Sequence, residues 1–183
     1  MEQVHRASLV AIESPQPPAQ PIPGCDALTT RLAGVAVLVR TADCLPLFVW
    51  DPIQQVVGLA HAGWRGLVAR LPLRLIGFLR HVYHSDPRDL VVGIGPAIRA
   101  CCYEVGIEVA QRFGPFLRQT GGRRTCDLIG CATTQLLAAG VRPSRVVDCG
   151  CCTACDAARW HSVRRDGADA GRLVSFILLP IRP

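Results

Sequence analysis

Lysine and asparagine are absent from this sequence, and all twenty basic residues are arginine. Without lysine, the chain has no side-chain amine for Schiff-base chemistry, for holding pyridoxal phosphate, or for the phosphate-binding loop of nucleotide hydrolases. The formal net charge is +6, but the arginines are scattered along the chain rather than gathered in one stretch. Nucleic-acid binding depends on a clustered basic surface, so we expect no nucleic-acid partner.

Long hydrophobic runs are also missing. No apolar stretch approaches the roughly 20 residues that cross a bilayer, and the start, Met1-Glu2-Gln3-Val4-His5, does not resemble a signal peptide. Half of the 183 residues are hydrophobic, which predicts a packed core rather than disorder. We therefore expect one domain over residues 1–183, in a cytoplasmic protein with no membrane partner. The ten cysteines should then be mostly thiols.

Apolar runs and helical spacing alternate along the chain, which predicts the α/β class with mixed layers. A proline-rich stretch over residues 14–23 is expected to be a surface connector, and Pro72 bends a helix or marks its first turn. The predicted strands cover residues 34–39, 47–50, 56–60, 90–94, 145–149 and 173–179. The predicted helices cover residues 67–84, 106–116 and 126–139.

Cys44 and His61 each lie just past the end of a predicted hydrophobic strand. Loops at strand ends are where a rigid scaffold presents reactive groups. If neighbouring strands bring the two side chains together, two chemistries are open: a thiolate–imidazole nucleophile pair that needs no metal, or a metal site with sulfur and nitrogen donors. The alternative without function is a core thiol and a structural histidine.

A second cysteine-rich stretch occupies residues 149–155 and contains a C-x-x-C pair, Cys152 and Cys155. Metal sites of this kind usually have a second pair at a fixed spacing, and none follows in the sequence. We therefore expect structural or incidental thiols here rather than a metal site. The adjacent Cys101 and Cys102 are expected to contribute to packing.

Five motifs resemble those of the bacterial laccase-domain family, also described as YfiH-like purine nucleoside phosphorylases. They occur in the family's order and span nearly the whole chain, and Cys152-Thr153 matches a further Cys-Thr of the family. The motifs are Gln3-Val4-His5, Thr41-Ala42-Asp43-Cys44-Leu45-Pro46, His61-Ala62-Gly63-Trp64-Arg65-Gly66, Gly95-Pro96-Ala97-Ile98 with Cys102-Tyr103-Glu104-Val105, and Ser162 with Arg164-Arg165-Asp166-Gly167.

The resemblance implies a YfiH-like fold, a buried mixed sheet flanked by helices, and a metal site formed by His5, Cys44 and His61. Zn²⁺ is the implied metal, with Cu²⁺ as the alternative. It implies purine nucleoside phosphorolysis, acting on adenosine, inosine, guanosine or methylthioadenosine, together with adenosine deamination; the substrates are a nucleoside and phosphate. Catalysis would then involve Cys44, His61 and Arg65. Asp26, Arg164 and Arg165 are the expected substrate-binding residues.

The family is also described as polyphenol oxidoreductases, which would be laccase-like and copper-dependent. A laccase needs several coppers and many histidines, whereas this chain has five histidines in all. The histidine count therefore favours a single metal ion, and with it the processing of purine nucleosides. Family members usually carry a further segment before Gln3-Val4-His5, so His5 is expected to be loosely held, and a degenerate binding module with reduced activity is a further alternative. Oligomeric state is not predicted.

Overall fold

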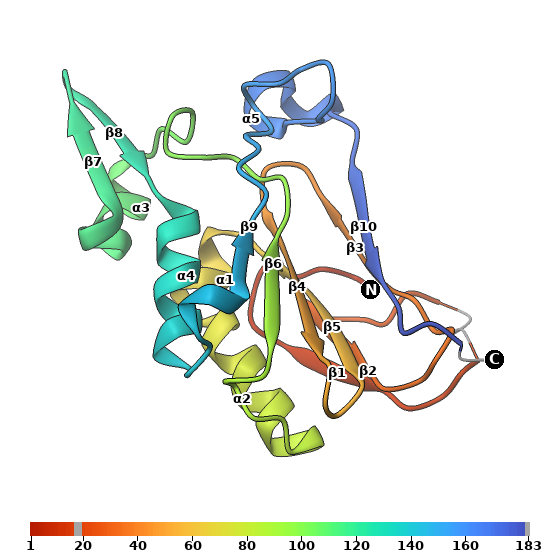
Figure 1. Cartoon of the computed structure of the whole chain (residues 1–183). Helices are drawn as coiled ribbons and strands as arrows, with labels where there is room; N and C mark the ends of the chain where they lie inside the picture. Colours follow the sequence, from red (N-terminus) through yellow and green to blue (C-terminus); the bar gives the residue numbers. More distant parts are fainter. Residues whose placement is uncertain (17–19, 182–183) are drawn as a thin grey trace.

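The computed structural model describes residues 1–16 and 20–181, and its central feature is a six-stranded sheet (Figure 1). The outer pairs β1–β2 and β6–β9 are parallel and the inner neighbours are antiparallel, so the predicted α/β class with a mixed sheet is confirmed. In spatial order the strands are β1 (Leu9–Ile12), β2 (Ala27–Thr30), β5 (Val56–Ala62), β4 (Leu45–Asp51), β6 (Val91–Ile94) and β9 (Val146–Asp148).

The hairpin of β4 and β5 lies in the middle of this sheet. The two strands pair along their whole length, from Leu45 opposite Ala62 to Asp51 opposite Val56. The Asp51 carboxylate accepts backbone hydrogen bonds from Ile53 at 2.8 Å and Gln54 at 2.9 Å, which closes the turn. Every residue of β5 is buried, as expected for a continuous apolar strand that is covered on both faces.

Helices α1 (Trp64–Val68), α2 (Leu71–Tyr83) and α4 (Leu128–Ala138) cover one face of the sheet (Figure 1). Helix α2 buries Leu71, Leu75 and Leu79, which recur every four residues and so form one apolar stripe. Pro72 lies in its first turn, as predicted. Gly140, at φ 98°, follows the end of α4 in a conformation that other residues rarely adopt.

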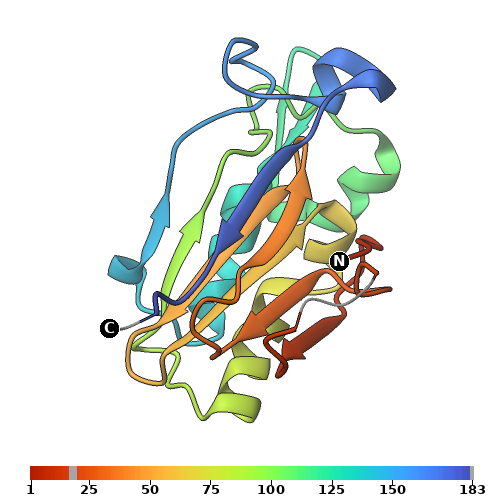
Figure 2. The same ribbon diagram turned by 90° about the vertical axis from the view of Figure 1, so that its right-hand side faces the viewer.

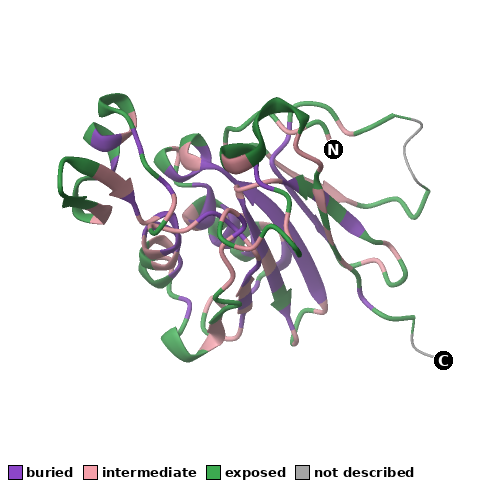
Figure 3. Cartoon of the chain, turned by 90° about the horizontal axis from the view of Figure 1, so that it is seen from above, coloured by how far each residue is buried: buried purple, intermediate pink, exposed green. Residues whose placement is uncertain are grey.

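A strand pair covers the opposite face of the sheet. Strands β3 (Val37–Thr41) and β10 (Leu173–Ile177) are antiparallel and lie together in front of the main sheet in Figure 2. Val37 and Val39 are buried in the same cluster as Leu59 of β5. Seen from above, the buried strands lie between the helices and this pair (Figure 3). The core is therefore split into two layers by the sheet.

The remaining elements are short and lie outside these layers. A hairpin of two strands extends away from the helices in Figure 1. This hairpin, β1 and β2 were not among the predicted strands, because all of them are only four residues long. These elements are α3 (Ile107–Phe113), β7 (Leu117–Thr120), β8 (Arg123–Cys126), α5 (Val163–Asp166) and the 3₁₀ turns Gly114–Phe116, Pro143–Arg145 and Gly167–Asp169.

Within residues 1–16 and 20–181, no helix has the length and apolar character that crossing a membrane requires. The predicted connector at residues 14–23 lies partly outside the described residues, at 17–19. Its described part is mostly exposed, in keeping with a surface segment.

Candidate metal centre

His5, Cys44 and His61 come together in the structure. One donor atom from each lies within 4.8 Å of the other two, and the two imidazole rings meet edge to face with centroids 4.6 Å apart. One detail of the prediction is wrong: His61 does not follow a strand but lies inside β5, opposite Pro46 of β4. Because Cys44 directly precedes β4, this pairing places the thiol beside the imidazole.

The Asp26 carboxylate, which is fully buried, fixes two of these donors. It contacts Nδ1 of His61 at 3.3 Å, which leaves Nε2 as the ring nitrogen available to a ligand. It also accepts hydrogen bonds from the backbone N–H groups of Val4 at 3.1 Å, His5 at 2.8 Å and Arg6 at 2.6 Å. His5 has a left-handed backbone, with φ 56°, and these bonds hold it there.

Gln3 adds a second attachment for the same segment. Its side-chain amide donates to the carbonyl of Arg40 at 2.7 Å and accepts from the Arg40 N–H at 2.8 Å, so it pairs with β3 as a further strand residue would. We expected His5 to be loosely held, but in the structure hydrogen bonds hold its segment in place. The His5 backbone N–H donates to Asp26, and the bonds between Gln3 and Arg40 hold the segment two residues earlier.

Cys44 is held in a tight and strained turn. Asp43, the residue before it, has φ 88°, and its carboxylate accepts hydrogen bonds from the Thr153 hydroxyl at 2.6 Å and the Arg164 N–H at 2.7 Å. A Cβ atom at Gly63 would lie 3.0 Å from the Cys44 sulfur, so a larger residue there would displace the thiol slightly. Burial, with Asp43 adding to it, raises the pKa of the Cys44 thiol to about 12.

Burial also determines the protonation of His61, which is 2% exposed. Its pKa is lowered by burial and by the nearby His5, while the hydrogen bond to Asp26 acts in the opposite direction. The neutral ring is therefore favoured, and the neutral ring has the lone pair that binds a cation. Two imidazoles and one sulfur, positioned by hydrogen bonds to Asp26 and Asp43, form a donor set that fits Zn²⁺ or Cu²⁺.

The three donors line a cavity of about 1040 Å³ between the N-terminal segment, the end of β3 and the start of β10. Two arginines line it as well, Arg40 and Arg172, and the sequence analysis missed both. Arg40 directly precedes the Thr41-Ala42-Asp43-Cys44 motif, which is a signal that could have been used. Arg172 is brought in by the pairing of Leu173 with Thr41, which no spacing in the sequence reveals.

The three predicted arginines lie elsewhere around the centre, and none of them lines the cavity. Arg65 is exposed on α1, with its guanidinium carbon 4.2 Å from the centroid of Trp64. Arg164 stacks on Tyr103 at 5.0 Å. Arg165 donates to its neighbour Asp166 and to three backbone carbonyls. Its guanidinium therefore stabilises the loop that precedes α5.

The other three histidines are not part of a donor group in the described ranges 1–16 and 20–181. His81 and His84 lie at the end of α2, and His161 packs against Gly171. One further donor group does occur there, and the sequence analysis missed it: Cys101, Cys102, Cys152 and Cys155. Within it, burial acts to raise the pKa of Cys152, but hydrogen bonds from the backbones of Arg99 and Cys155 lower it to about 7.

Comparisons with known proteins show the family to which the chain belongs. The family model described as multi-copper polyphenol oxidoreductase laccase matches residues 1–180. The chain is 37% identical over 191 residues to the purine nucleoside phosphorylase YlmD of Geobacillus stearothermophilus, covering 96% of this chain and 70% of that protein. It is 32% identical over 163 residues to adenosine deaminase RL5 of an unknown prokaryotic organism, covering 84% of this chain and 62% of that protein.

The fold is also that of a solved structure. The crystal structure of the hypothetical protein YfiH of Bacillus licheniformis superposes with a TM-score of 0.92 at 26% sequence identity. The match covers 97% of this chain and 72% of that one. Helices, mixed sheet and covering strand pair are therefore a shared architecture.

Proposed function

Because this chain belongs to the multi-copper polyphenol oxidoreductase laccase family, we propose that it is a metal-dependent enzyme that acts on purine nucleosides. The proposed reactions are phosphorolysis of adenosine, inosine, guanosine or methylthioadenosine, a transferase activity, and hydrolytic deamination of adenosine. The names of the relatives, a purine nucleoside phosphorylase and an adenosine deaminase, support both. The observation that carries the proposal is the meeting of His5, Cys44 and His61 at one cavity.

Zinc is the metal we propose for these donors, with copper as the alternative. Three protein ligands that leave one position open are typical of catalytic zinc, and Cys and His are among its usual ligands. The contact of Asp26 with Nδ1 of His61 supports this assignment, because metal-binding histidines usually donate their other ring nitrogen to a carboxylate or carbonyl. When bound, zinc supplies a Lewis acid and lowers the pKa of a bound water to about 7.

The protein's own residues bind and orient the reactants. In phosphorolysis a phosphate oxygen forms a bond to C1′ of the ribose while the bond from C1′ to the purine nitrogen breaks. Arg40 and Arg172 line the cavity and provide the positive charge that holds the phosphate. In deamination a water oxygen adds at C6 of adenine and ammonia leaves. Asp26 keeps the His61 proton on Nδ1 throughout, so that Nε2 remains a donor to the centre.

Three rival functions are less well supported. A Cys44–His61 nucleophile without metal needs a thiolate, and burial holds the pKa of that thiol at about 12. A laccase needs further histidine-rich copper sites, while His81, His84 and His161 lie away from the one group of described donors that contains histidine. A binding module without activity would hold the metal and turn over no nucleoside.

The test is turnover of adenosine and inosine, with and without phosphate, by the metal-loaded protein. We expect ammonia from adenosine without phosphate, and free base with ribose 1-phosphate when phosphate is present. Cys44→Ala should abolish both reactions, while His81→Ala, which changes an exposed imidazole on α2, should leave them intact. Turnover by Cys44→Ala equal to that of the wild type would overturn the proposal. Oxygen-dependent oxidation of a phenol by the copper-loaded protein would favour the laccase alternative.

A further inference from the structure

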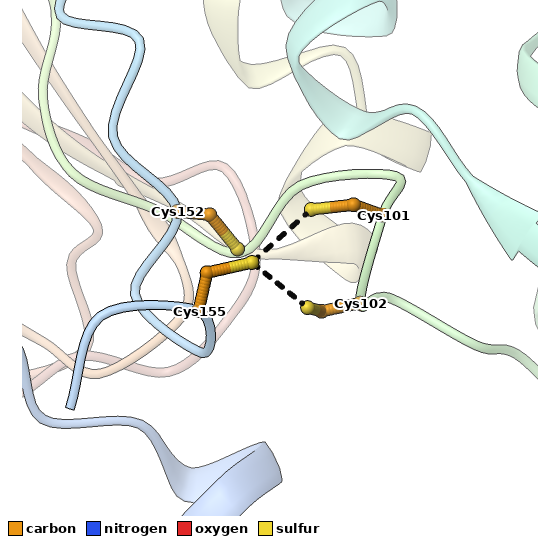
Figure 4. Close-up of side chains that lie close together, drawn as sticks. All are labelled: Cys101, Cys102, Cys152 and Cys155. Atoms are coloured by element: carbon orange, nitrogen blue, oxygen red, sulfur yellow. Dashed lines mark hydrogen bonds between the residues drawn. The ribbon is translucent and has the colours of Figure 1, made fainter.

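Four cysteines outside the proposed catalytic centre form a compact group of their own. The sulfurs of Cys101, Cys102, Cys152 and Cys155 all lie within 4.8 Å of one another. Figure 4 shows the four side chains converging on one point, two from the loop after β6 and two from the segment after β9. Two of the contacts are shorter still: the sulfur of Cys155 lies 3.6 Å from that of Cys101 and 3.3 Å from that of Cys102.

Backbone pairing brings the two segments together. Ala97 and Cys152 form an isolated parallel bridge, in which the Ala97 N–H donates to the carbonyl of Cys151 at 3.3 Å and the Thr153 N–H donates to the carbonyl of Ala97 at 3.2 Å. On the first segment, the N–H groups of Cys102 and Tyr103 both donate to the carbonyl of Arg99, at 2.9 and 2.8 Å. This turn presents the adjacent cysteines on the same side of the chain.

The spacing of the sulfurs fits a tetrahedral metal site. Zinc–sulfur bonds are about 2.3 Å, so the edges of a tetrahedron of thiolates around zinc are about 3.8 Å. The contacts at 3.3 and 3.6 Å, with all separations below 4.8 Å, fall around that value. A disulfide requires about 2.05 Å between sulfurs, and all four cysteines are free thiols.

Around Cys152, hydrogen-bond donors and a cation lie close to the sulfur. The Cys152 sulfur accepts hydrogen bonds from the backbones of Arg99, Ala154 and Cys155, and such bonds stabilise negative charge on sulfur. The guanidinium of Arg99, which is paired with Asp148, lies near enough to Cys152 to interact with its charge. Four thiolates around one Zn²⁺ have a net charge of −2, which a neighbouring cation offsets.

We propose that Cys101, Cys102, Cys152 and Cys155 bind one structural zinc ion. Each thiol releases its proton to solvent as its sulfur bonds the metal, and four protein ligands leave no open position for water or substrate. The ion fastens the turn after Arg99 to the segment that leads to α5. That segment includes Thr153, whose hydroxyl donates to Asp43, so the zinc stabilises the support of Cys44 without touching it.

Zinc content of purified protein tests this site independently of the catalytic centre. We expect about two zinc ions per chain in the wild type and about one in Cys101→Ser/Cys155→Ser, which changes two exposed residues. The matched control is Cys149→Ser/Cys151→Ser, which removes two thiols of the same region from outside the group and should retain about two. Equal zinc content in the two double variants would overturn the proposal.

The Cys44→Ala background separates the two sites. That variant should retain about one zinc ion, and adding Cys101→Ser/Cys155→Ser should remove it. The catalytic proposal could fail on its own, if His5, Cys44 and His61 bind no metal. The wild type would then contain about one zinc ion, and Cys101→Ser/Cys155→Ser would still remove that ion.

Two further measurements test the four-cysteine site if a double variant does not fold. Cys44→Ala loaded with Co²⁺ should show the intense visible and thiolate charge-transfer absorption of a tetrahedral tetrathiolate complex, and a pale octahedral spectrum would overturn the proposal. Mass spectrometry after alkylation should find all four thiols free once zinc is removed by acid. A Cys102–Cys155 disulfide in protein purified with reductant would contradict the site and indicate a redox-active pair instead.

Discussion

The two donor groups of this molecule differ in their donor atoms and in what lies beside them. His5, Cys44 and His61 comprise two nitrogens and one sulfur, are supported by a buried carboxylate, and line a cavity of about 1040 Å³. Cys101, Cys102, Cys152 and Cys155 comprise four sulfurs from two surface segments, and none of them lines that cavity. Three donors leave a position for substrate, whereas four complete the coordination of zinc. We therefore propose catalysis at the first group, called the open site below, and a structural role for the second, called the closed site.

The largest difference between the two groups is expected in turnover. Removing a ligand from the open site with Cys44→Ala should reduce nucleoside turnover by more than about 100-fold, because even the loss of a supporting partner of a ligand costs up to that much. Steady-state assays with adenosine and inosine measure it. If Cys44→Ala keeps turnover within about tenfold of the wild type, Cys44 is not a ligand that catalysis requires, and the proposed difference between the two sites is wrong.

The support of the open site is the next point to test. Asp26→Asn removes the charge that faces Nδ1 of His61 and part of the hydrogen bonding to residues 4–6, so metal affinity should fall by about 10- to 100-fold. Competition with a chelator measures the affinity. Asp51→Asn is the control, because it also alters a buried carboxylate but one that closes the β4–β5 turn, and it should lower stability without changing metal affinity.

A smaller effect is expected from the arginines of the cavity. Arg40→Ala or Arg172→Ala should raise the KM for phosphate about tenfold, since a hydrogen bond to a charged group contributes about 1.5 kcal/mol. Metal content and deamination without phosphate should change little. Arg74→Ala on α2 serves as the control for loss of an exposed arginine. Equal KM values for phosphate in all three variants would mean that the phosphate binds elsewhere.

The smallest effect on turnover is expected at the closed site. Cys101→Ser/Cys155→Ser should change kcat by less than about threefold while lowering Tm by several degrees, since about 1 kcal/mol shifts the Tm of a chain of this size by about 2–4 °C. Thermal unfolding and turnover of the same sample measure both. A loss of turnover as large as that of Cys44→Ala would show that the four cysteines take part in the reaction.

Much of the open site could be predicted from the sequence, because its motifs are local. The family resemblance of the motifs around Cys44 and His61 implies the donors, and the apolar run over residues 56–60 predicts most of the strand that contains His61. Asp26 was predicted to bind substrate, but its carboxylate is fully buried, contacts His61 and does not line the cavity. The predicted end of the strand was wrong. His61 lies inside β5, because β5 stays paired with β4 as far as Ala62, opposite Leu45.

The closed site and the arginines of the cavity could not be predicted, because tertiary pairing creates both. A cysteine metal site usually has a second spaced pair, and none follows Cys152 and Cys155 in the sequence. The partners are adjacent cysteines about fifty residues upstream, delivered by a single bridge between Ala97 and Cys152. In the same way, Arg172 reaches the cavity only through the register of β10 on β3.

The most direct test of the catalytic account is a crystal structure of the zinc-loaded protein with anomalous diffraction measured on both sides of the zinc absorption edge. The account predicts an anomalous peak bonded to His5, Cys44 and His61, with its open side toward Arg40 and Arg172. A map from active crystals with no peak among these three side chains would contradict it.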